Sequence, residues 1–359
     1  MKIFKDAGGT ILTQTKALDL LTDAQGTIVG LRAGVWIRSP LEANLKLINL
    51  RGRAFVLACG GFQSNPEYRQ RYFGPEADLA PSLGHPYNQG DGIRMAQKVS
   101  RAALSGGMTT YSATWGAAYP CKYALEDSEV WEKATYTPGR GSLDWLSSST
   151  VPSMPAGAIL VNLNGERYVD ENAVYPRSPH PTLRQPQAKG IMVFDQAMYG
   201  SIAVYHDLKI EECIAGIRAA GGVVVIANTI DEVADALAKL PTPAHKANLL
   251  KTITEYNAAI GTGKGAELQV ARTGTSAKIE KPPFYAIPTS PRVYACFGGL
   301  AINQYAQVLD TQQAPVPNLY AIPPTAGGVM RNVYTGMIGC GGTFGWIAGN
   351  YIAAIFKKG

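Results

Sequence analysis

Three pairs of adjacent glycines carry the clearest chemical signal in this sequence. They lie in ACGGF (58–62), CFGGL (296–300) and TAGGV (325–329), each beside residues typical of a buried strand. Glycine has no Cβ, so a backbone with two glycines in a row can approach a partner very closely. The recurrence predicts that the backbone at these three places packs against one flat partner.

A fourth glycine cluster, GCGGTFG (339–345), leads into an apolar helix near the end of the chain. Backbone N–H groups at a helix N-terminus have no partner within the helix, and they suit an anion or an electron-rich carbonyl. Glycines that only permit a tight turn and close packing are the alternative interpretation. Helical spacing predicts an apolar face made of Phe344, Ile347, Ala348, Tyr351, Ile352 and Ile355.

The stretch NLYAIPPTAGGVMRNVYTG (318–336) begins like a buried strand and then opens into a loop. Pro323 and Pro324 remove two backbone donors and indicate a rigid exit from the strand. Arg331 could bind an anion or form an ion pair at the surface. The Tyr334 phenol has an ordinary pKa of about 10, so it can transfer a proton only where its surroundings shift that pKa.

The elements that must position these loops alternate between strand and helix patterns. Short β-rich runs are predicted at 26–33, 44–50 and 53–61, and buried strands at 157–162, 189–195 and 223–228. Helical spacing appears over 91–104, 229–240 and 245–260. The helix over 229–240 begins with a capping box formed by Thr229 and Glu232.

The composition indicates a folded protein with a large core and argues against a nucleic-acid-binding protein. The chain has 359 residues, of which 46% are hydrophobic and 17% charged, so it can bury a large core. The formal charge of +6 comes without a dense cluster of Lys and Arg, which argues against nucleic-acid binding and allows a small anionic ligand.

The cysteines and histidines predict no metal site. All five cysteines and all four histidines are scattered, and no CxxC pair occurs, as expected for reduced thiols inside a cell. The first residues lack the apolar core of a signal peptide, and no run of 18 apolar residues exists to span a membrane. We therefore expect a cytoplasmic protein.

As a set, several stretches resemble the flavoproteins of the fumarate reductase and succinate dehydrogenase type, which include tricarballylate dehydrogenases and 3-ketosteroid dehydrogenases. They follow the family's order: VLACGGFQSNPEYRQRY, NQGDGIRMAQ, ILVNLNGERYVDEN, ITEYNAAI, PPFYAI, GGLAINQYAQVLD, NLYA with AGG, and FGWIAGNYIAA. The resemblance implies an α/β protein. Its Rossmann-like FAD-binding core, residues 1–88 and 283–359, would be interrupted by an α+β capping domain at 89–282.

The resemblance also implies a reaction. A hydride would pass between FAD and the carbon beta to a carbonyl or carboxylate of a small molecule, with proton transfer at the alpha carbon. This is the chemistry of an oxidoreductase acting on CH–CH bonds. We predict that the cofactor contacts Ala58, Gly60, Gly61, Asp91, Gly298, Gly299, Gly328, Gly342, Thr343 and Phe344.

The catalytic positions depart from those of dicarboxylate-reducing members. Tyr175 stands at the expected place of the proton-donating arginine, with Arg177 nearby, and Tyr334 stands where a carboxylate-binding arginine is expected. Tyr294 lies just before CFGG, where a histidine is common. Together with Arg331, these residues look more like the 3-ketosteroid dehydrogenase pattern, in which phenols polarise a ketone. The Tyr- and Trp-rich segment 104–145 suggests a larger, flatter or less charged substrate than a dicarboxylate.

One family feature is absent from the sequence. No GxGxxG occurs between a predicted strand and a helix, although that turn binds the FAD pyrophosphate, and Pro323 and Pro324 replace the family's usual Gly-Glu pair. We expect a missing N-terminal segment, a partner chain or a homo-oligomer to complete the protein. Two alternatives remain: a non-catalytic homologue that binds a ligand or a partner, and a cofactor-independent isomerase or lyase that uses Tyr334 with an arginine.

Overall fold

A computed structural model describes residues 2–38, 43–74, 79–80, 82, 87–108, 111–117, 157–172, 180–199, 210–219, 222–274, 276–330 and 336–357. The chain forms two compact units. The first comprises Met1–Tyr68, Asn88–Tyr111 and Ala295–Gly359, and the second comprises Arg69–Tyr87 and Ser112–Tyr294. Residues 88–111 therefore belong with the first unit, whereas the predicted capping domain began at residue 89.

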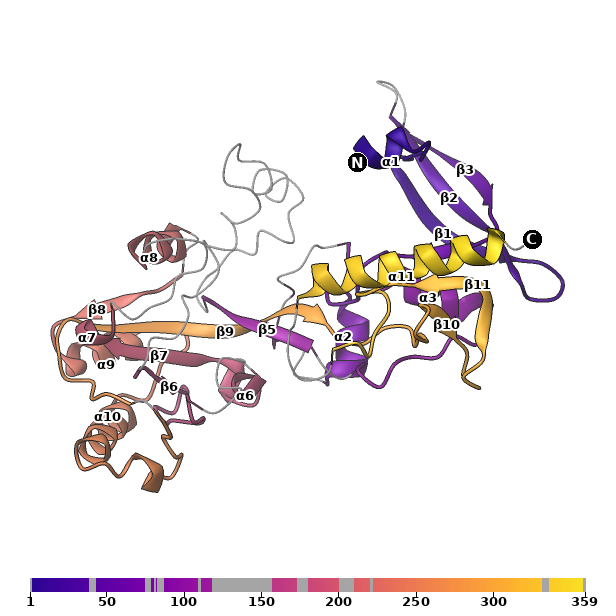
Figure 1. Cartoon of the computed structure of the whole chain (residues 1–359). Coiled ribbons are helices and arrows are strands. Elements are labelled where there is room, and N and C mark those ends of the chain that lie inside the picture. The colour runs from indigo at the N-terminus through magenta and orange to yellow at the C-terminus, as the bar shows by residue number, and fades with distance from the viewer. Residues whose placement is uncertain are drawn as a thin grey trace. The chain divides into compact units, whose positions relative to one another are not determined.

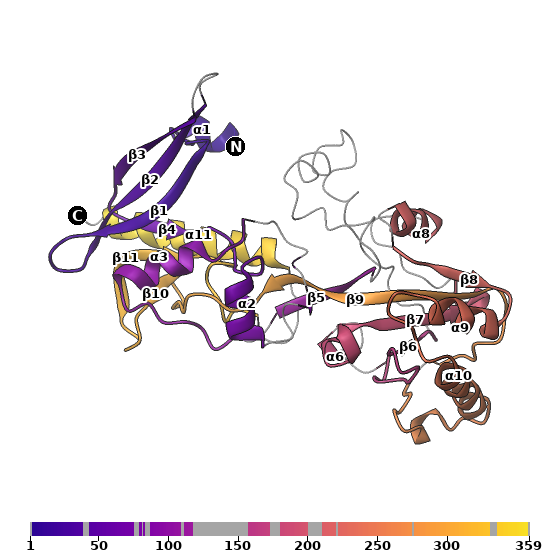
Figure 2. The same cartoon turned by 180° about the vertical axis from the view of Figure 1, so that it is seen from behind.

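An antiparallel sheet opens the first unit. Its strands are β1 (Thr15–Thr22), β2 (Ile28–Arg38) and β3 (Ala43–Arg51), in that order, after the short helix α1 (Lys2–Asp6). Figures 1 and 2 show this sheet from its two sides. Leu20 and Ile28 are buried, while Leu45 and Leu47 are exposed on β3. The predicted β-rich runs at 26–33 and 44–50 are confirmed as β2 and β3.

A second sheet of the first unit contains a parallel pair of strands. Its order is β10 (Gln307–Leu309), β11 (Pro315–Ala321) and β4 (Phe55–Leu57), and β11 pairs with β4 in parallel. The helix α3 (Asp91–Val99) buries Ile93, Met95 and Ala96. The helix predicted over 91–104 ends earlier because the Thr311 N–H donates to the carbonyl oxygen of Arg101 and the Ala103 N–H donates to that of Leu309.

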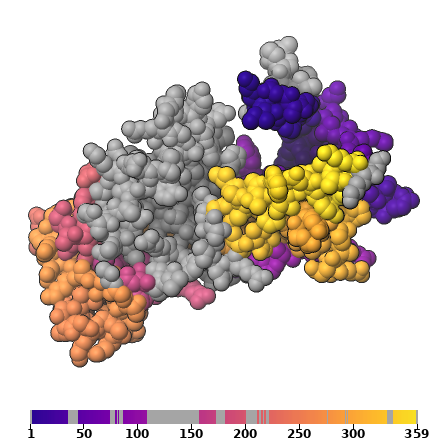
Figure 3. Space-filling model, viewed as in Figure 1, coloured from indigo at the N-terminus to yellow at the C-terminus, as the bar shows by residue number. Residues whose placement is uncertain are grey.

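Among the described residues, the last helix, α11 (Met337–Lys357), packs on this sheet through the side that carries Tyr351. Tyr351 stacks on Tyr305 at a centroid distance of 4.4 Å and meets Tyr320 of β11 edge-on. Of the predicted apolar face, Ala348 is buried, but Ile355 is 42% exposed. Figure 3 shows much of α11 open to solvent on this face.

A five-stranded sheet organises the second unit. The strands β5 (Tyr111–Ala117), β9 (Phe284–Cys296), β7 (Gly190–Asp195) and β6 (Ile159–Val161) follow in that order, and β8 (Val225–Ala227) also pairs with β9. Every residue of β7 is buried. The buried strands predicted at 157–162 and 189–195 are therefore confirmed as β6 and β7. The run at 223–228 does form a strand, β8, but the prediction that it is buried is wrong, because Ile226 is 42% exposed.

Helices cover this sheet and complete its core. Val233 and Leu237 of one helix, with Leu249 and Ile253 of another, join the buried strand residues in one cluster. The predicted capping box is confirmed, because the Thr229 hydroxyl accepts from the N–H of Glu232 at 3.1 Å. The helical elements are α2 (Pro66–Phe73), which begins in the first unit, then α6 (His180–Leu183), η2 (Pro186–Ala188), α7 (Gln196–Tyr199), α8 (Ile210–Ala219), α9 (Ile230–Ala238), α10 (Lys246–Gly261) and η4 (Gly265–Glu267).

No helix in the described part of the chain is long and apolar enough to cross a membrane.

Candidate functional site

The loops that follow β4 and β11 meet at one edge of the parallel sheet. The N–H of Ile322 donates to the carbonyl oxygen of Leu57 at 3.0 Å, and the Thr325 hydroxyl donates to the carbonyl oxygen of Gly60 at 3.0 Å. Thr325 is fully buried, so this contact ties the two loops together. Ligands of α/β proteins commonly bind where the carboxyl ends of parallel strands meet.

The other predicted glycine pair joins the same edge. The N–H of Leu300 donates to the carbonyl oxygen of Thr325 at 2.9 Å, and the N–H of Gly327 donates to the carbonyl oxygen of Leu300 at 3.0 Å. A Cβ on Gly299 would collide with the carbonyl oxygen of Thr325, and one on Gly327 would collide with the Gly299 nitrogen. The three glycine pairs are thus brought together, but the crowding at Gly299 and Gly327 is against the protein's own backbone.

The pair Gly60–Gly61 differs because its backbone N–H groups have no acceptor among the described residues. Gly60 has φ of +83°, a conformation that favours glycine. A Cβ on Gly61 would collide with the Cys296 sulfur, which accepts from the N–H of Phe62 at 3.2 Å. The N–H groups of Gly60 and Gly61 donate to no acceptor among the described residues. These two donors suit an anionic or carbonyl-bearing ligand at the carboxyl end of β4.

Because the Cys296 thiol is buried, we expect the free energy of unfolding to fall as the pH rises into the alkaline range. Burial raises the pKa of the thiol to about 11. A pKa raised by folding stabilises the protein below the unfolded value of about 9, and this contribution disappears as the pH rises towards 11. Between pH 8 and 10 we expect wild type to lose about 1 kcal/mol more unfolding free energy than Cys296→Ala. Urea unfolding at each pH measures the slopes, and equal slopes would contradict the assignment.

The N-terminus of α3 approaches the same loops. A Cβ on Gly92 would lie 2.7 Å from the Thr325 methyl group, so glycine is needed for this approach. Asp91 opens the helix, and its carboxylate pairs with Lys16 at 3.3 Å and with Arg94 at 3.2 Å. The predicted cofactor residue Asp91 therefore lies beside the loop cluster with its charge already balanced.

The helix α11 begins earlier than its glycine pattern indicated. Gly336 has φ of +101°, and its carbonyl oxygen accepts from the N–H of Cys340 at 3.1 Å. The helical N–H groups without an intrahelical partner are those of the first residues from Met337 onwards. Gly342, Thr343 and Phe344 lie inside the helix, so our expectation that the cluster frees their N–H groups is wrong.

Four residues at this edge went unpredicted. Thr325 and Cys296 stand inside glycine-rich stretches that we did single out, and the Asn88 side chain lies against Gly60. The Ser105 N–H donates to the carbonyl oxygen of Gly299 at 2.9 Å, and its hydroxyl accepts from the Gly299 N–H at 3.2 Å. Ser105 is followed by a further glycine pair, which is the sequence signal that could have revealed it.

The predicted catalytic side chains lie outside the described residues. Arg331 and Tyr334 fall in the undescribed segment 331–335, and Tyr175 and Arg177 in 173–179. The backbone of Tyr294 belongs to β9, but its side chain is not described. The cofactor positions and not the catalytic ones therefore define the candidate site. Among the described residues, no group of His, Cys, Asp and Glu could hold a metal ion.

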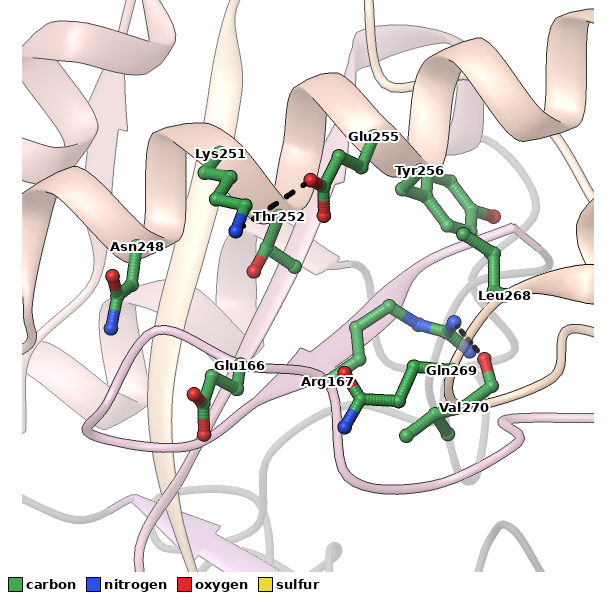
Figure 4. A pocket seen from close by; sticks show the side chains of 10 residues that line it. All are labelled: Glu166, Arg167, Asn248, Lys251, Thr252, Glu255, Tyr256, Leu268, Gln269 and Val270. Atoms are coloured by element: carbon green, nitrogen blue, oxygen red, sulfur yellow. Dashed lines mark hydrogen bonds and ion pairs between the residues drawn. The ribbon is translucent and has the colours of Figure 1, made fainter.

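A cavity of about 150 Å³ lies beside α10 in the second unit (Figure 4). Several of its polar groups bind other groups of the protein: Lys251 pairs with Glu255 at 3.8 Å, and the Thr252 hydroxyl donates to the carbonyl oxygen of Gly165. None of the predicted site residues lines it. The lining residues are Glu166, Arg167, Asn248, Lys251, Thr252, Glu255, Tyr256, Leu268, Gln269 and Val270.

Arg167, which lines this cavity, also belongs to a buried ionic cluster. Glu171 accepts from Arg167 Nε at 3.0 Å, from Arg272 Nη1 at 2.8 Å and from the N–H of Leu160 at 2.9 Å. Side-chain exposure is 0% for Glu171, 1% for Arg272 and 6% for Arg167. Arg167 also donates to the carbonyl oxygen of Val270 at 2.6 Å. The cluster joins three separate segments, and its single carboxylate is shared by two guanidinium cations.

Known proteins resemble this chain along nearly its whole length. A family model described as FAD binding domain matches residues 1–344. The NADH:acrylate oxidoreductase of Vibrio harveyi is 28% identical over 91% of this chain and 28% of its own length. A flavocytochrome c3 fumarate reductase has a TM-score of 0.67 at 22% identity, covering 97% of this chain and 53% of that one. The 3-ketosteroid delta1-dehydrogenase of Sterolibacterium denitrificans has a TM-score of 0.71 at 21% identity, covering 98% and 61%.

Proposed function

This chain belongs to the FAD-binding domain family, and from that premise we propose that it is the FAD-holding part of an oxidoreductase acting on CH–CH bonds. The observation that carries the proposal is the meeting of three glycine pairs at the carboxyl ends of β4 and β11, with the Gly60 and Gly61 N–H groups available. Available donors at such an edge fit a flavin with its carbonyls and pyrophosphate.

The residues that would hold the cofactor come from the loops of this edge and from the helices α3 and α11. FAD, when bound, would supply the acceptor or donor for a hydride at the carbon beta to a carbonyl or carboxylate. Gly60, Gly61 and Gly328 would offer it their backbone, since a Cβ at these places would meet Asn88, Cys296 and Ser105 respectively. The remaining proposed contacts are Ala58, Asp91, Gly298, Gly299, Gly342, Thr343 and Phe344.

The proton and the substrate carbonyl would be handled by phenols and guanidinium groups. Tyr334 with Arg331 is the proposed pair at the substrate, where the phenol donates or accepts the proton and the arginine binds the carbonyl or carboxylate oxygen. Tyr175, Arg177 and Tyr294 are the further candidates for proton transfer. The chain spans 28% of the length of the Vibrio harveyi relative, so the whole activity is proposed for the completed protein.

Completion by an N-terminal segment, a partner chain or a homo-oligomer belongs to the same proposal. The sequence holds no GxGxxG turn between a strand and a helix, and that turn would supply the pyrophosphate site. The scattered reduced cysteines keep the cytoplasm as the proposed location.

A flavin absorption spectrum tests the proposal directly. The purified protein is incubated with FAD, alone and together with candidate completing segments, and free flavin is removed by gel filtration. We expect a retained flavin spectrum that responds to an added α,β-unsaturated carboxylate or enone. Protein that remains colourless under every one of these conditions would contradict the proposal and would favour the non-catalytic homologue.

The proposed role of Tyr334 gives a sharper prediction. In flavin-loaded protein, Tyr334→Phe should lower kcat/KM about a hundredfold, because proton transfer by a positioned side chain contributes roughly that factor or more. Tyr305→Phe is the matched control, since Tyr305 is 42% exposed and stacks on Tyr351. Steady-state kinetics measures both variants. An unchanged kcat/KM in Tyr334→Phe, or an equal loss in both, would remove Tyr334 from the reaction.

A further inference from the structure

Two side-chain amides flank the glycine pair at the carboxyl end of β4. A Cβ on Gly61 would lie 2.7 Å from Gln63 Oε1, and a Cβ on Gly60 would collide with Asn88 Oδ1. Gln63 is 5% exposed and Asn88 is half-buried. Neither amide nitrogen donates to an acceptor among the described residues. A buried donor without an acceptor is costly, and in native proteins it usually marks a place where a ligand or an ordered water binds.

The Cys296 thiol sets the orientation of the Gln63 amide. Burial raises the pKa of this thiol to about 11, so it keeps its proton at neutral pH. Its sulfur accepts from the N–H of Phe62 at 3.2 Å, and its S–H donates to Gln63 Oε1 at 3.4 Å. Because the amide oxygen faces the sulfur, the Nε2 group points away from it. The two N–H groups of the Gln63 amide are therefore available as donors beside Gly61.

Backbone hydrogen bonds hold Asn88 against the same loop. Its carbonyl oxygen accepts from the N–H of Ser64 at 3.1 Å. Two residues later, the N–H of Gly90 donates to the carbonyl oxygen of Gly61 at 3.0 Å. These two bonds anchor Asn88 to the loop that follows β4, and they place its side-chain amide beside Gly60.

The side-chain groups nearest the two glycines carry no formal charge. They are the Asn88 and Gln63 amides, the Cys296 thiol and the Pro324 ring. Sites for phosphate or carboxylate groups commonly supply an Arg or Lys side chain, because a charged donor binds an anion more strongly than a neutral one. This edge instead offers neutral donors, two from the glycine backbone and the others from two amide groups. Such a set fits a ligand whose hydrogen-bond acceptors are uncharged.

We propose that Gln63 and Asn88 are cofactor-contacting residues, whose amide N–H groups join those of Gly60 and Gly61 in binding the uncharged oxygen and nitrogen acceptors of a flavin ring. The inference rests on the proposed function and narrows it, since it assigns this edge to the isoalloxazine ring and not to the pyrophosphate. Cys296 is a positioning residue in this arrangement, because its thiol binds the Gln63 oxygen and leaves the Gln63 nitrogen for the ligand.

Binding of three probes to the full chain tests this assignment. Riboflavin contains the ring, ADP contains a pyrophosphate without the ring, and FAD contains both. Each is added to the chain alone and with the completing segments used for the flavin spectrum, and fluorescence or calorimetric titration gives each Kd. We expect Gln63→Met and Asn88→Ala each to raise the Kd of riboflavin and of FAD at least about tenfold, because each leaves a ligand acceptor unpaired. Neither substitution should alter the binding of ADP.

The control variants separate a contact with the ligand from a role in folding. Gln25→Met is the matched control, since Gln25 is an exposed glutamine in the turn between β1 and β2, and it should leave every Kd unchanged. Cys296→Ala removes the donor that orients the Gln63 amide and should weaken riboflavin binding by less than Gln63→Met does. Cys296→Ser restores a donor and should recover most of that loss. In nitrogen NMR, the Gln63 and Asn88 side-chain amide signals should shift when riboflavin is added.

The outcomes separate this inference from the proposed function. If both amide variants bind riboflavin and FAD as wild type does, the inference is overturned and the proposed function stands. ADP that shifts the Gln63 amide signal, or that binds more weakly to Gln63→Met, also overturns the inference. Riboflavin that binds through Gln63 without any response of the flavin to an unsaturated carboxylate or enone supports the inference and contradicts the proposed function. Wild type that binds no flavin under any condition contradicts both. If Gln63→Met does not fold by circular dichroism, Asn88→Ala and the NMR shifts decide.

Discussion

Replacing Glu171 with alanine is expected to lower the free energy of unfolding by about 3–5 kcal/mol. The carboxylate is fully buried and accepts from Arg167, from Arg272 and from the N–H of Leu160. Without it, two buried guanidinium groups would lose the carboxylate that they share, and one backbone donor would lose its acceptor. The penalty arises from these stranded groups and exceeds the net value of the intact cluster.

Urea unfolding of Glu171→Ala followed by circular dichroism measures this loss. Glu255→Ala is the matched control, because Glu255 pairs with Lys251 at 3.8 Å and both side chains are well exposed. Exposed pairs of this kind contribute at most about 0.5 kcal/mol. A loss below about 1 kcal/mol in Glu171→Ala would mean that water reaches the cluster. That result would contradict the complete burial of Glu171.

Local patterns predicted the elements of this fold well. The Thr229 capping box depends on residues three apart, and the buried run of β7 depends on six consecutive residues, so both could be recognised from short stretches. Family motifs were equally informative, because the predicted FAD-binding α/β family is confirmed by a match over residues 1–344.

Contacts between distant segments could not be predicted from such patterns. The bond from Thr325 to Gly60 joins residues 265 positions apart, and the bond from Phe62 to the Cys296 sulfur joins residues 234 positions apart. Glycine pairs indicated that the backbone is crowded there, but not that the crowding partner at Gly299 is Gly327. The spacing of residue types along one sequence does not show which distant segments pair, because this pairing depends on strand order and register.

The prediction of where α11 begins was wrong for a related reason. Glycine is a poor helix former, so a stretch with Gly339, Gly341 and Gly342 reads as a turn by local propensity. In the structure Gly341 lies against Pro323, and the helix starts at Met337, ahead of these glycines. Close packing on the neighbouring loop overrides the propensity, and that loop is set by tertiary structure.

The backbone approach at the candidate site leads to the second large expected effect. Gly299→Ala should lower the free energy of unfolding by about 3 kcal/mol, the upper range for forcing extra volume into packed structure. The added Cβ would meet the Thr325 carbonyl oxygen, the Gly327 nitrogen at 2.8 Å and the Ala326 carbonyl carbon at 2.9 Å. All three are backbone atoms, so relief requires the loops themselves to move apart and to stretch the bonds that Leu300 makes with Thr325 and Gly327.

The control for Gly299→Ala should change stability in the opposite direction. Gly349 lies in the interior of α11 with nothing within 4 Å of a built Cβ, so Gly349→Ala should stabilise the chain by up to about 1 kcal/mol through helix propensity. Urea unfolding measures both variants, and flavin retention is compared wherever wild type binds FAD. We expect Gly299→Ala alone to lose flavin, because its added Cβ would push away Thr325, which bonds to both Leu300 and Gly60. If Gly299→Ala were as stable as wild type, the close backbone approach that defines this edge would be refuted, and with it the reason that glycine pairs recur in the sequence.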